Sequence, residues 1–318
     1  MRRADRETTI AVVFTCAAML CFSVVPVFLR HFTRAEFGLD AWTVNAVRYG
    51  TAAVFWLPFV VVLSRRLPGG APLPQAGRSV WVAALVPTAC NLIGQVGWAT
   101  CPYYADAPTI GFVIRTSFLF TVVFGFLFIP AERPLARSPL FLIGSAICVG
   151  GVATMFGGQP GGDGSGTGPA GLALILATAL CWGAYAVCVR RCLAGYPLRL
   201  AFGVISLYTT AGLVVLMLIF GQYGALASLP ARIWVLLVVS GLLGIAFGHV
   251  LYYRGIHGIG PVVASGLMLA GPFFTYLTSV IFLPADRISL ARTLGGVAVV
   301  VGGLALVRAK ARVSVLEK

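Results

Sequence analysis

Two stretches decide the fold: FIPAER at residues 128–133 and FLPADR at residues 282–287. Each one closes a long apolar segment, and both follow the order apolar, Pro, Ala, acid, Arg. Two further matches keep the same order along the chain: LCFS at 20–23 with LCWG at 180–183, and WV at 81–82 with WV at 234–235. Similarity repeated at a nearly fixed separation indicates a duplicated unit. The sequence therefore predicts two homologous halves.

The composition shows which solvent surrounds these halves. Of 318 residues, 59% are hydrophobic and 10% are charged, with a mean hydropathy of +0.96. Ordinary soluble domains have roughly 45–50% apolar and about 25% charged residues. This chain is therefore expected in a bilayer, as an all-α protein of ten transmembrane helices with no separate soluble domain. The expected spans are 9–30, 41–63, 80–101, 105–129, 138–157, 170–190, 200–220, 232–253, 258–283 and 290–308.

The net charge of +14 indicates orientation and not nucleic-acid binding, because the basic residues sit at the ends of apolar runs. With the N-terminus inside, most of the 23 Lys and Arg fall in cytoplasmic segments, and only Arg48 and Arg115 lie within spans. We expect both termini in the cytoplasm and the chain in the cytoplasmic (inner) membrane. The apolar stretch 10–29 is too long for a signal peptide and is expected to be a retained first span.

Equivalent motifs of the two halves lie about five spans apart. Because five is odd, the second half is expected to enter the membrane from the opposite side. Such inverted repeats suit alternating access. A Gly-rich stretch lies between them and is expected to be a flexible linker. The expected division is a first repeat at 1–157, a linker at 158–169, a second repeat at 170–309 and a cytoplasmic tail at 310–318.

With these motifs in this order, the whole chain resembles the drug/metabolite transporter superfamily, and within it the EamA-type transporters. The Pro-Ala-acid-Arg motifs carry the resemblance, together with the Gly-rich span that follows each, the mid-span Pro272 and Arg48. One departure is RTSF at 115–118, where the family often has a proline. The resemblance implies a secondary transporter, with export of amino acids or related metabolites as the expected activity.

Arg115 is the residue most suggestive of a binding site. It lies about ten residues into the fourth expected span, about 15 Å deep at 1.5 Å per residue. An arginine there costs at least about 2.5 kcal/mol and normally faces a partner or a wet cavity. Its planar fork suits a carboxylate or phosphate. Two interpretations remain: Arg115 binds an acidic group of the substrate, or it bonds carbonyl groups or Asn91.

Other polar and aromatic side chains in the spans are candidates for the same site. Asn91, Gln95 and Trp98 share one face of the third span, where they either bridge helices or line the pathway. His249 either couples transport to protons or bonds between helices. Energy is expected from a gradient or from exchange. The remaining candidates are aromatic walls of a pocket: Trp182, Tyr185, Tyr208 and Tyr276, with Phe22.

Another set of residues is assigned to gating or structure. The acid–Arg pairs either gate the two mouths or anchor the span ends, and interfacial anchoring is the favoured interpretation because charges there cost little. Pro272 and Pro26 are expected to interrupt their helices and free carbonyl groups toward a cavity. The residues in this set are Arg48, Glu132, Arg133, Pro272, Asp286 and Arg287.

Competing functions find weaker support. The sequence contains no GxxxxGK[ST] motif for nucleotide binding, no carboxylate cluster for a membrane-embedded enzyme and no filter loop for a channel. The eight cysteines are expected to be buried apolar residues, and no metal or cofactor is expected. Efflux of cationic drugs is the alternative within the transporter class, but it calls for a buried carboxylate where this chain offers Arg115. The expected partners are a small-molecule substrate and the lipid bilayer.

Overall fold

The computed structural model describes residues 2–32, 37–66, 79–104, 110, 113–156, 168–282 and 290–316. Within these ranges every regular element is a helix. In this part of the chain, eight helices or continuous helix runs are long and apolar enough to cross a bilayer, or nine if a bent pair counts as one span. The chain is thus a multi-pass membrane protein, as its composition predicts.

Helices occupy each of the expected apolar segments. Those of the first half are α1 (Arg2–Phe32), α2 (Ala41–Arg66), α3 (Val80–Ala83), α4 (Leu85–Thr100), η2 (Cys101–Tyr103), η3 (Ile114–Thr116), α6 (Ser117–Phe128), η4 (Pro130–Arg137) and α7 (Pro139–Phe156). Those of the second half are α8 (Pro169–Cys192), α9 (Leu198–Phe220), η5 (Tyr223–Ser228), α10 (Ala231–Gly241), η6 (Leu242–Phe247), α11 (Gly248–Ile259), α12 (Pro261–Met268), α13 (Gly271–Phe282) and α14 (Leu290–Leu316).

Two apolar segments fall short of the length required for a regular span. The run Ile114–Phe128 meets Pro130–Arg137 at a bend of 117°, and α7 is apolar only over Pro139–Met155. The 3₁₀ turn η2 separates the third and fourth segments near the expected place. The Gly-rich stretch at 157–167 lies outside the described residues, and α14 continues as a helix past its expected end at 308.

Besides the one-residue break between α3 and α4, three described segments contain an interrupted helix, each at a different kind of backbone feature. A turn at 269–270 separates α12 from α13, next to Pro272, as the sequence predicts. The fourth segment departs from α-helix at η3, although it has no proline there. In the eighth segment η6 is a π-helix turn between α10 and α11. Such irregular turns often mark functional sites, because they leave backbone groups without their regular partners.

The halves are packed into each other and not side by side. The main contacts are those of α7 with α14, α2 with α9, α1 with α11 and α13, and α8 with α4 and α6. Every one of these pairs joins a first-half helix to a second-half helix. Small residues allow the close approach, which is the usual way helices associate in lipid.

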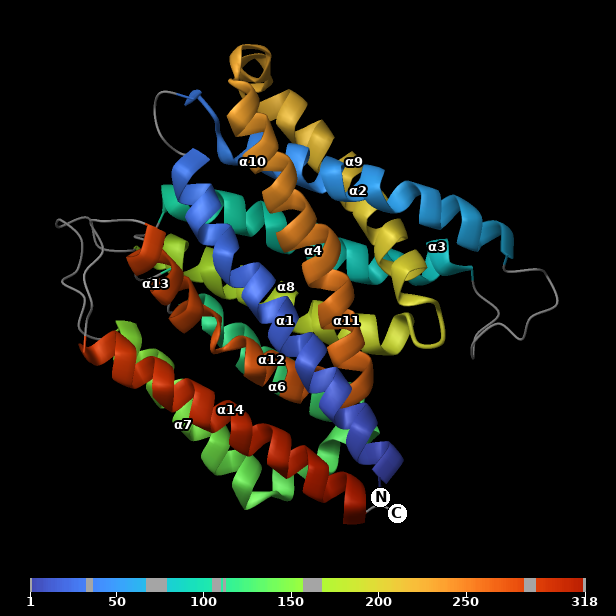
Figure 1. The fold of residues 1–318 in the computed structure, drawn as a ribbon, viewed down its shortest axis with the longest axis vertical. Helices are drawn as coiled ribbons and strands as arrows, with labels where there is room; N and C mark the ends of the chain where they lie inside the picture. The colour runs from blue at the N-terminus through green and yellow to red at the C-terminus, as the bar shows by residue number, and fades with distance from the viewer. Residues whose placement is uncertain are drawn as a thin grey trace.

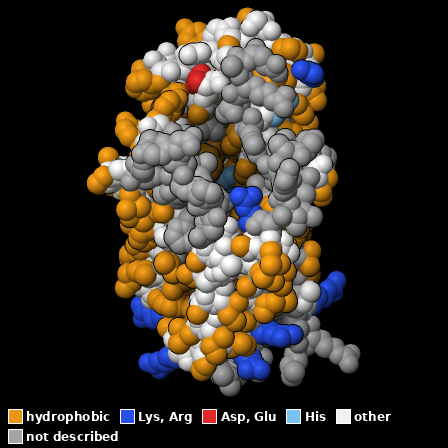
Figure 2. All heavy atoms as spheres, turned by 90° about the vertical axis from the view of Figure 1, so that its left-hand side faces the viewer, with side chains coloured by type: hydrophobic (Ala, Val, Ile, Leu, Met, Phe, Trp, Pro, Cys, Tyr) orange, Lys and Arg blue, Asp and Glu red, His pale blue; other side chains and the backbone are white. Residues whose placement is uncertain are grey.

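The two termini lie at the same end of the molecule (Figure 1). Figure 2 shows a largely apolar surface on one face, with most of the Lys and Arg side chains on that face gathered at the same end. This distribution agrees with a protein whose flanks face lipid and whose ends face water.

Candidate functional site

A cavity of about 280 Å³ lies between the two halves. It is lined by side chains from α1, α2, α4, α6, α8, α11, α12 and α13, and from the irregular turns η3 and η6. All three interrupted segments therefore meet at this cavity. Its volume is near the lower limit of ordinary small-molecule sites, which suits a ligand of metabolite size.

The cavity collects seven of the nine residues expected to bind substrate. They come from four segments that are far apart in the sequence, and Phe22 and Pro26 of α1 join them. The seven are Asn91, Gln95, Trp98, Arg115, Trp182, Tyr185 and His249.

The other two, Tyr208 and Tyr276, do not line it. Tyr208 lies on α9, which contributes no lining residue, and its ring packs edge-on against Trp81 at a centroid distance of 5.7 Å. On α13 the cavity face is formed by Gly271 and Thr275, one turn apart, so the next residue, Tyr276, points elsewhere. There it is buried, with the guanidinium of Arg292 5.7 Å from its ring centroid. Neither tyrosine belongs to the wall of this cavity.

Arg115 is brought to the cavity by the 3₁₀ turn η3. Its Nε is buried and has no hydrogen-bond partner within the described part of the chain. Asp106, the nearest acidic residue in the sequence, lies outside that part. No hydrogen bond joins Arg115 to Asn91 among the described contacts, so the Asn91 part of the structural interpretation gains no support. Instead, Asn91 Nδ2 donates to Tyr49 Oη and to Thr209 Oγ1, each at 3.1 Å, and so ties α4 to α2 and α9.

A second arginine in the cavity is Arg48, which the sequence assigned to gating or structure. It is 5% exposed, and its Nε donates to Ser240 Oγ at 3.1 Å. A Cβ at Gly244 would lie 3.1 Å from Arg48 Nη2, so the glycine leaves room for the guanidinium. The sequence did contain a signal that Arg48 faces the cavity. Asn45, Arg48 and Tyr49 are spaced so that they share one face of a helix, and all three line the cavity.

The two arginines set the electrostatic character of the cavity. Among the described residues no Asp or Glu lines it. A buried guanidinium without a carboxylate partner favours a ligand that brings negative charge with it. The rest of the lining is mostly apolar and aromatic, including a Trp98–Trp182 pair with ring centroids 5.4 Å apart.

His249 occupies an aromatic cage beside the π-helix turn. Its ring stacks on Phe202 at 5.0 Å and meets Phe22 edge-on at 5.1 Å, while Nδ1 lies 3.1 Å from Ile245 O. Gly248 lets α1 approach, because a Cβ there would lie 2.7 Å from Phe22 Cε1. The position combines a hydrogen bond within its own helix with access to the cavity, so neither interpretation of His249 is removed.

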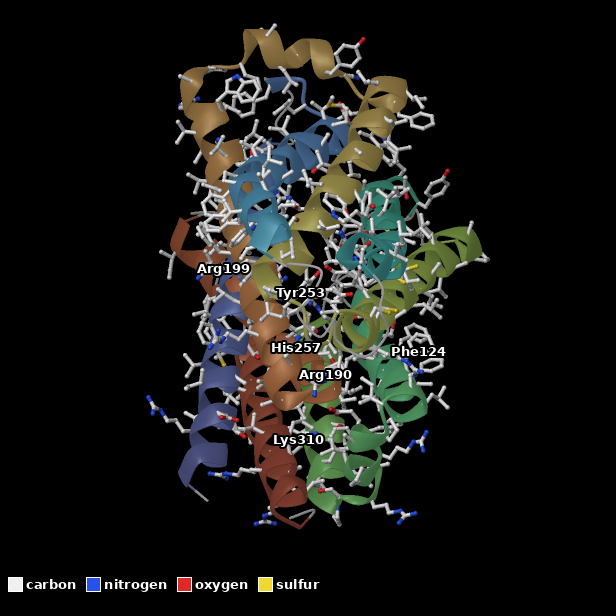
Figure 3. The ribbon with its side chains drawn as sticks, turned by 90° about the vertical axis from the view of Figure 1, so that its right-hand side faces the viewer. Phe124, Arg190, Arg199, Tyr253, His257 and Lys310 are labelled. Atoms are coloured by element: carbon white, nitrogen blue, oxygen red, sulfur yellow. The ribbon has the colours of Figure 1, made fainter. Side chains whose placement is uncertain are left out.

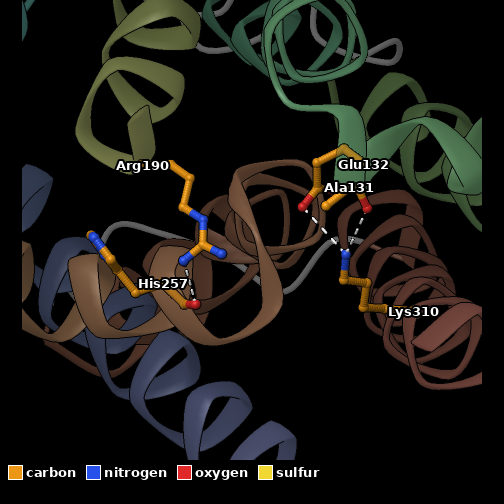
Figure 4. A network of polar contacts seen from close by, with 5 residues as sticks. All are labelled: Ala131, Glu132, Arg190, His257 and Lys310. Atoms are coloured by element: carbon orange, nitrogen blue, oxygen red, sulfur yellow. Dashed lines mark hydrogen bonds and ion pairs between the residues drawn. The ribbon is translucent and has the colours of Figure 1, made fainter. Parts of the chain in front are cut away.

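The first acid–Arg pair forms contacts at the end of the molecule that carries the termini. Glu132 is 2% exposed, and its Oε1 lies 3.3 Å from Lys310 Nζ of α14 (Figure 4). Arg133 donates from Nε to Phe126 O at 2.9 Å, where α6 ends. Thus Arg133 bonds the end of α6, whereas Glu132 contacts a helix of the other half. The second pair, Asp286 and Arg287, lies outside the described residues.

A further contact between helices lies in the same region. Arg190 of α8 donates from Nη1 to His257 O of α11 at 2.6 Å. Figure 3 shows Arg190, His257 and Lys310 together in the lower half of the molecule. Polar contacts therefore link different helices at this end of the molecule.

Within the described part of the chain, no group of three or more His, Cys, Asp or Glu could hold a metal ion, and the cysteines there are all free thiols. The cavity lies among membrane-spanning helices and has cationic and aromatic walls.

These features define a multi-pass helical membrane protein with a pocket between its helices, in which two arginines face mostly apolar and aromatic walls. Residues 169–308, in the second half of the chain, match the EamA-like transporter family of the drug/metabolite transporter superfamily. Over these residues the match confirms the family expected from the sequence. One solved structure, named only "Crystal structure of protein", is similar with a TM-score of 0.72 and 19% identity over 93% of this chain and 96% of that one, and it supports the fold alone. No curated protein matches the chain.

Proposed function

We propose that the chain is a secondary transporter that moves a small zwitterionic or anionic metabolite by alternating access. The observation that carries this proposal is the pair of cavity arginines, Arg48 and Arg115, with no acidic lining residue among those described. The proposed direction is export across the cytoplasmic membrane, as for amino acids or related solutes. The match of residues 169–308 to a transporter family supports this class of activity over catalysis.

The proposed architecture is ten membrane helices in two inverted five-helix repeats, 1–157 and 170–309, joined by the linker 158–169. The packing pattern supports it. Exchange of the halves turns the contact of α1 with α11 into that of α8 with α4, and the contact of α1 with α13 into that of α8 with α6. The pairs α2–α9 and α7–α14 map onto themselves. A pseudo-two-fold axis in the membrane plane would produce this set of contacts.

The interrupted segments supply further support. The FIPAER and FLPADR motifs begin at residues 128 and 282, which are 154 residues apart. The same separation relates the turn at 269–270 to residues 115–116, within η3. The two helices would then be broken at equivalent depth, as in transporters whose discontinuous helices hold the substrate near the midplane. Both termini at one end agree with an even number of spans, and the basic residues there favour the cytoplasmic side, with 310–318 as the tail.

Counterflow tests the proposed function. The purified full chain is reconstituted into proteoliposomes, and uptake of labelled amino acids, carboxylates and organic cations is compared with and without the same solute inside. We expect amino acids or carboxylates to exchange and cations to be inert. Exchange of organic cations alone would favour the alternative, cationic drug efflux. The absence of exchange under any gradient would refute transport.

Arg115 is the decisive residue for this assay. Arg115→Ala and Arg115→Lys are expected to lower exchange at least tenfold, because a lysine cannot reproduce the bidentate fork. Arg137→Ala, which removes an exposed arginine of η4 away from the cavity, is the matched control and should leave exchange unchanged. Wild-type exchange by correctly inserted Arg115→Ala would show that the guanidinium does not bind substrate.

Proton coupling by His249 remains a separate proposal. If protonation of this side chain drives transport, His249→Gln should still exchange solute across the membrane at equal pH but no longer accumulate it against a pH gradient. Accumulation at the wild-type level by this variant would assign the ring to packing between α11 and α1.

A further inference from the structure

The C-terminal end of α12 opens on the cavity. Ser265, Met268 and Leu269, from the last turn of this helix and the break after it, all line the wall. The last carbonyl groups of a helix have no intrahelical partner and carry the negative end of its dipole. This part of the wall is therefore rich in hydrogen-bond acceptors.

None of these three carbonyl groups receives the amide that a continuous helix would provide. In a continuous helix the Ser265 carbonyl would accept the N–H of Leu269, which instead bonds Gly266 O at 3.2 Å. The Met268 carbonyl would face Pro272, which has no N–H. The Leu269 carbonyl would accept the N–H of Phe273, which instead bonds Ala270 O at 3.1 Å. Among the hydrogen bonds of the described residues outside the regular helices, no other donor reaches these three carbonyl groups, so they can accept a bond from a ligand.

Positive charge lies beside these carbonyl groups, at the start of α6. Helix α6 packs against α12 in antiparallel fashion, because Gly125 approaches Val262 while a Cβ at Gly266 would lie 3.3 Å from Phe118 Cε2. The start of α6 is therefore next to the end of α12. Arg115 lies in η3, two residues before the first residue of α6, and the start of a helix carries partial positive charge. One region of the cavity consequently has a cationic and an anionic end.

We propose that this pair of helix ends binds the head group of an α-amino acid, with its carboxylate on Arg115 and its ammonium on the carbonyls of Ser265, Met268 and Leu269. An amino acid carries both charges on one carbon, which matches two adjacent helix ends. The proposal rests on the proposed function and narrows its substrate class from zwitterionic or anionic solutes to zwitterions.

A simple carboxylate would satisfy only half of this site. It would leave the α12 carbonyls without a donor, and buried polar groups left unpaired cost more than a hydrogen bond gains. Sites of this kind reject analogues that lack the expected donor by large factors. A sodium ion is the other cation that such carbonyls accept, so the test must separate it from an ammonium group.

Equilibrium binding of labelled compounds to the purified full chain tests this inference. The probes are phenylalanine, 3-phenylpropanoate and 2-phenylethylamine, and likewise leucine, 4-methylpentanoate and 3-methylbutylamine, in sodium and in potassium buffer. Each set keeps one apolar skeleton and removes one charge. We expect the acid and the amine to bind at least about tenfold more weakly than the amino acid, in either buffer.

Pro272→Ala tests the position of the ammonium group. It supplies an N–H for the Met268 carbonyl, so we expect the dissociation constant of the amino acid to rise severalfold while that of the acid is unchanged. Pro58→Ala, at an exposed proline inside α2 away from the cavity, is the matched control. Arg115→Gln should instead weaken the amino acid and the acid together.

The outcomes separate the two proposals. If the wild-type chain binds the acid as tightly as the amino acid, or binds it only in sodium, the ammonium site is refuted and an anion transporter remains. If it binds neither acids nor amino acids, the proposed function itself falls. The wild-type comparison decides this even if Pro272→Ala does not fold.

Discussion

Asp40 fixes the place where the chain enters α2. Its Oδ1 accepts the N–H of Thr43 at 2.9 Å, and its Oδ2 accepts Thr43 Oγ1 and the N–H of Gln222, each at 2.6 Å. The last bond ties the start of α2 to the end of α9. Partial burial raises the pKa of the Asp40 carboxyl, but hydrogen bonds from Thr43, Gln222 and Trp42 outweigh it, so the pKa lies below its usual value.

Asp40→Ala is expected to lower the free energy of unfolding by about 1 kcal/mol, the usual cost of losing a helix N-cap. Because the folded pKa is depressed, the stabilisation is present above the unfolded pKa of about 3.9 and is lost as pH falls through the folded value. Thermal midpoints in detergent should therefore differ between wild type and variant at pH 7 and converge below about pH 4. A difference that persists unchanged at pH 3 would contradict this role of the charge.

Side-chain depth could be predicted from the sequence, but the direction of a side chain around its helix could not. Arg115 was found from its distance into an apolar run, and the cavity does contain it. Tyr208 and Tyr276 were selected as aromatic residues in spans, yet both turn away, since one residue along a helix rotates the side chain by about 100°. Lys310 gave no sequence signal as the partner of Glu132, because the contact spans 178 residues.

The helix pair α7–α14 joins the ends of the two halves through small residues. A Cβ at Gly151 would lie 2.6 Å from Gly295 O and 2.8 Å from Val299 Cγ2. Its neighbour Gly150 has nothing within 4 Å of such a Cβ. Backbone approach this close is the main source of helix association in lipid, since the lipid tails compete with larger apolar side chains.

Gly151→Leu is therefore expected to destabilise the protein strongly, because the α7 and α14 backbones must separate, and overpacking typically costs about 1–3 kcal/mol. Gly150→Leu is the matched control on the same helix and should be neutral or slightly stabilising, since leucine is the better helix former. Thermal midpoints of the two variants in the same detergent make the comparison. Equal midpoints would show that the α7–α14 contact is not limiting.

Helix interruptions were predictable only where proline causes them. Pro272 predicts the break between α12 and α13, because it has no N–H to donate to a carbonyl group of the preceding turn. The 3₁₀ turn at Ile114–Thr116 and the π-helix turn at Leu242–Phe247 contain no proline, so tertiary packing must hold them. Pro26 shows the converse, since α1 continues as one helix through it.

Movement between the halves is the central requirement of the proposed mechanism. Glu132 lies where the first half contacts the second. From η4 of the first half it pairs with Lys310 of α14 and approaches Gly260, which has a φ of +83° and no side chain in the way. The side chains of Glu132 and Lys310 are 3% and 17% exposed, so water screens the pair little. Opening this end of the cavity would have to separate them.

Weakening this pair should therefore open the cavity toward the end that carries the termini. Glu132→Gln and Lys310→Gln are each expected to raise severalfold the rate at which an impermeant maleimide reaches Ser117→Cys in the cavity from that side, with the eight native cysteines replaced by alanine. Arg312→Gln, which removes an exposed cation of the same helix, should not change the rate.

The charge-swapped pair Glu132→Lys with Lys310→Glu separates attraction from packing. If the ion pair holds the end closed, the double variant should label more slowly than either single reversal, because it restores opposite charges across the same contact. Labelling as fast as in the single variants would instead mean that Glu132 acts through its seat against Gly260. In that case Gly260→Ala, which places a Cβ against the carboxylate and strains a left-handed backbone, should reproduce the faster labelling without any change of charge.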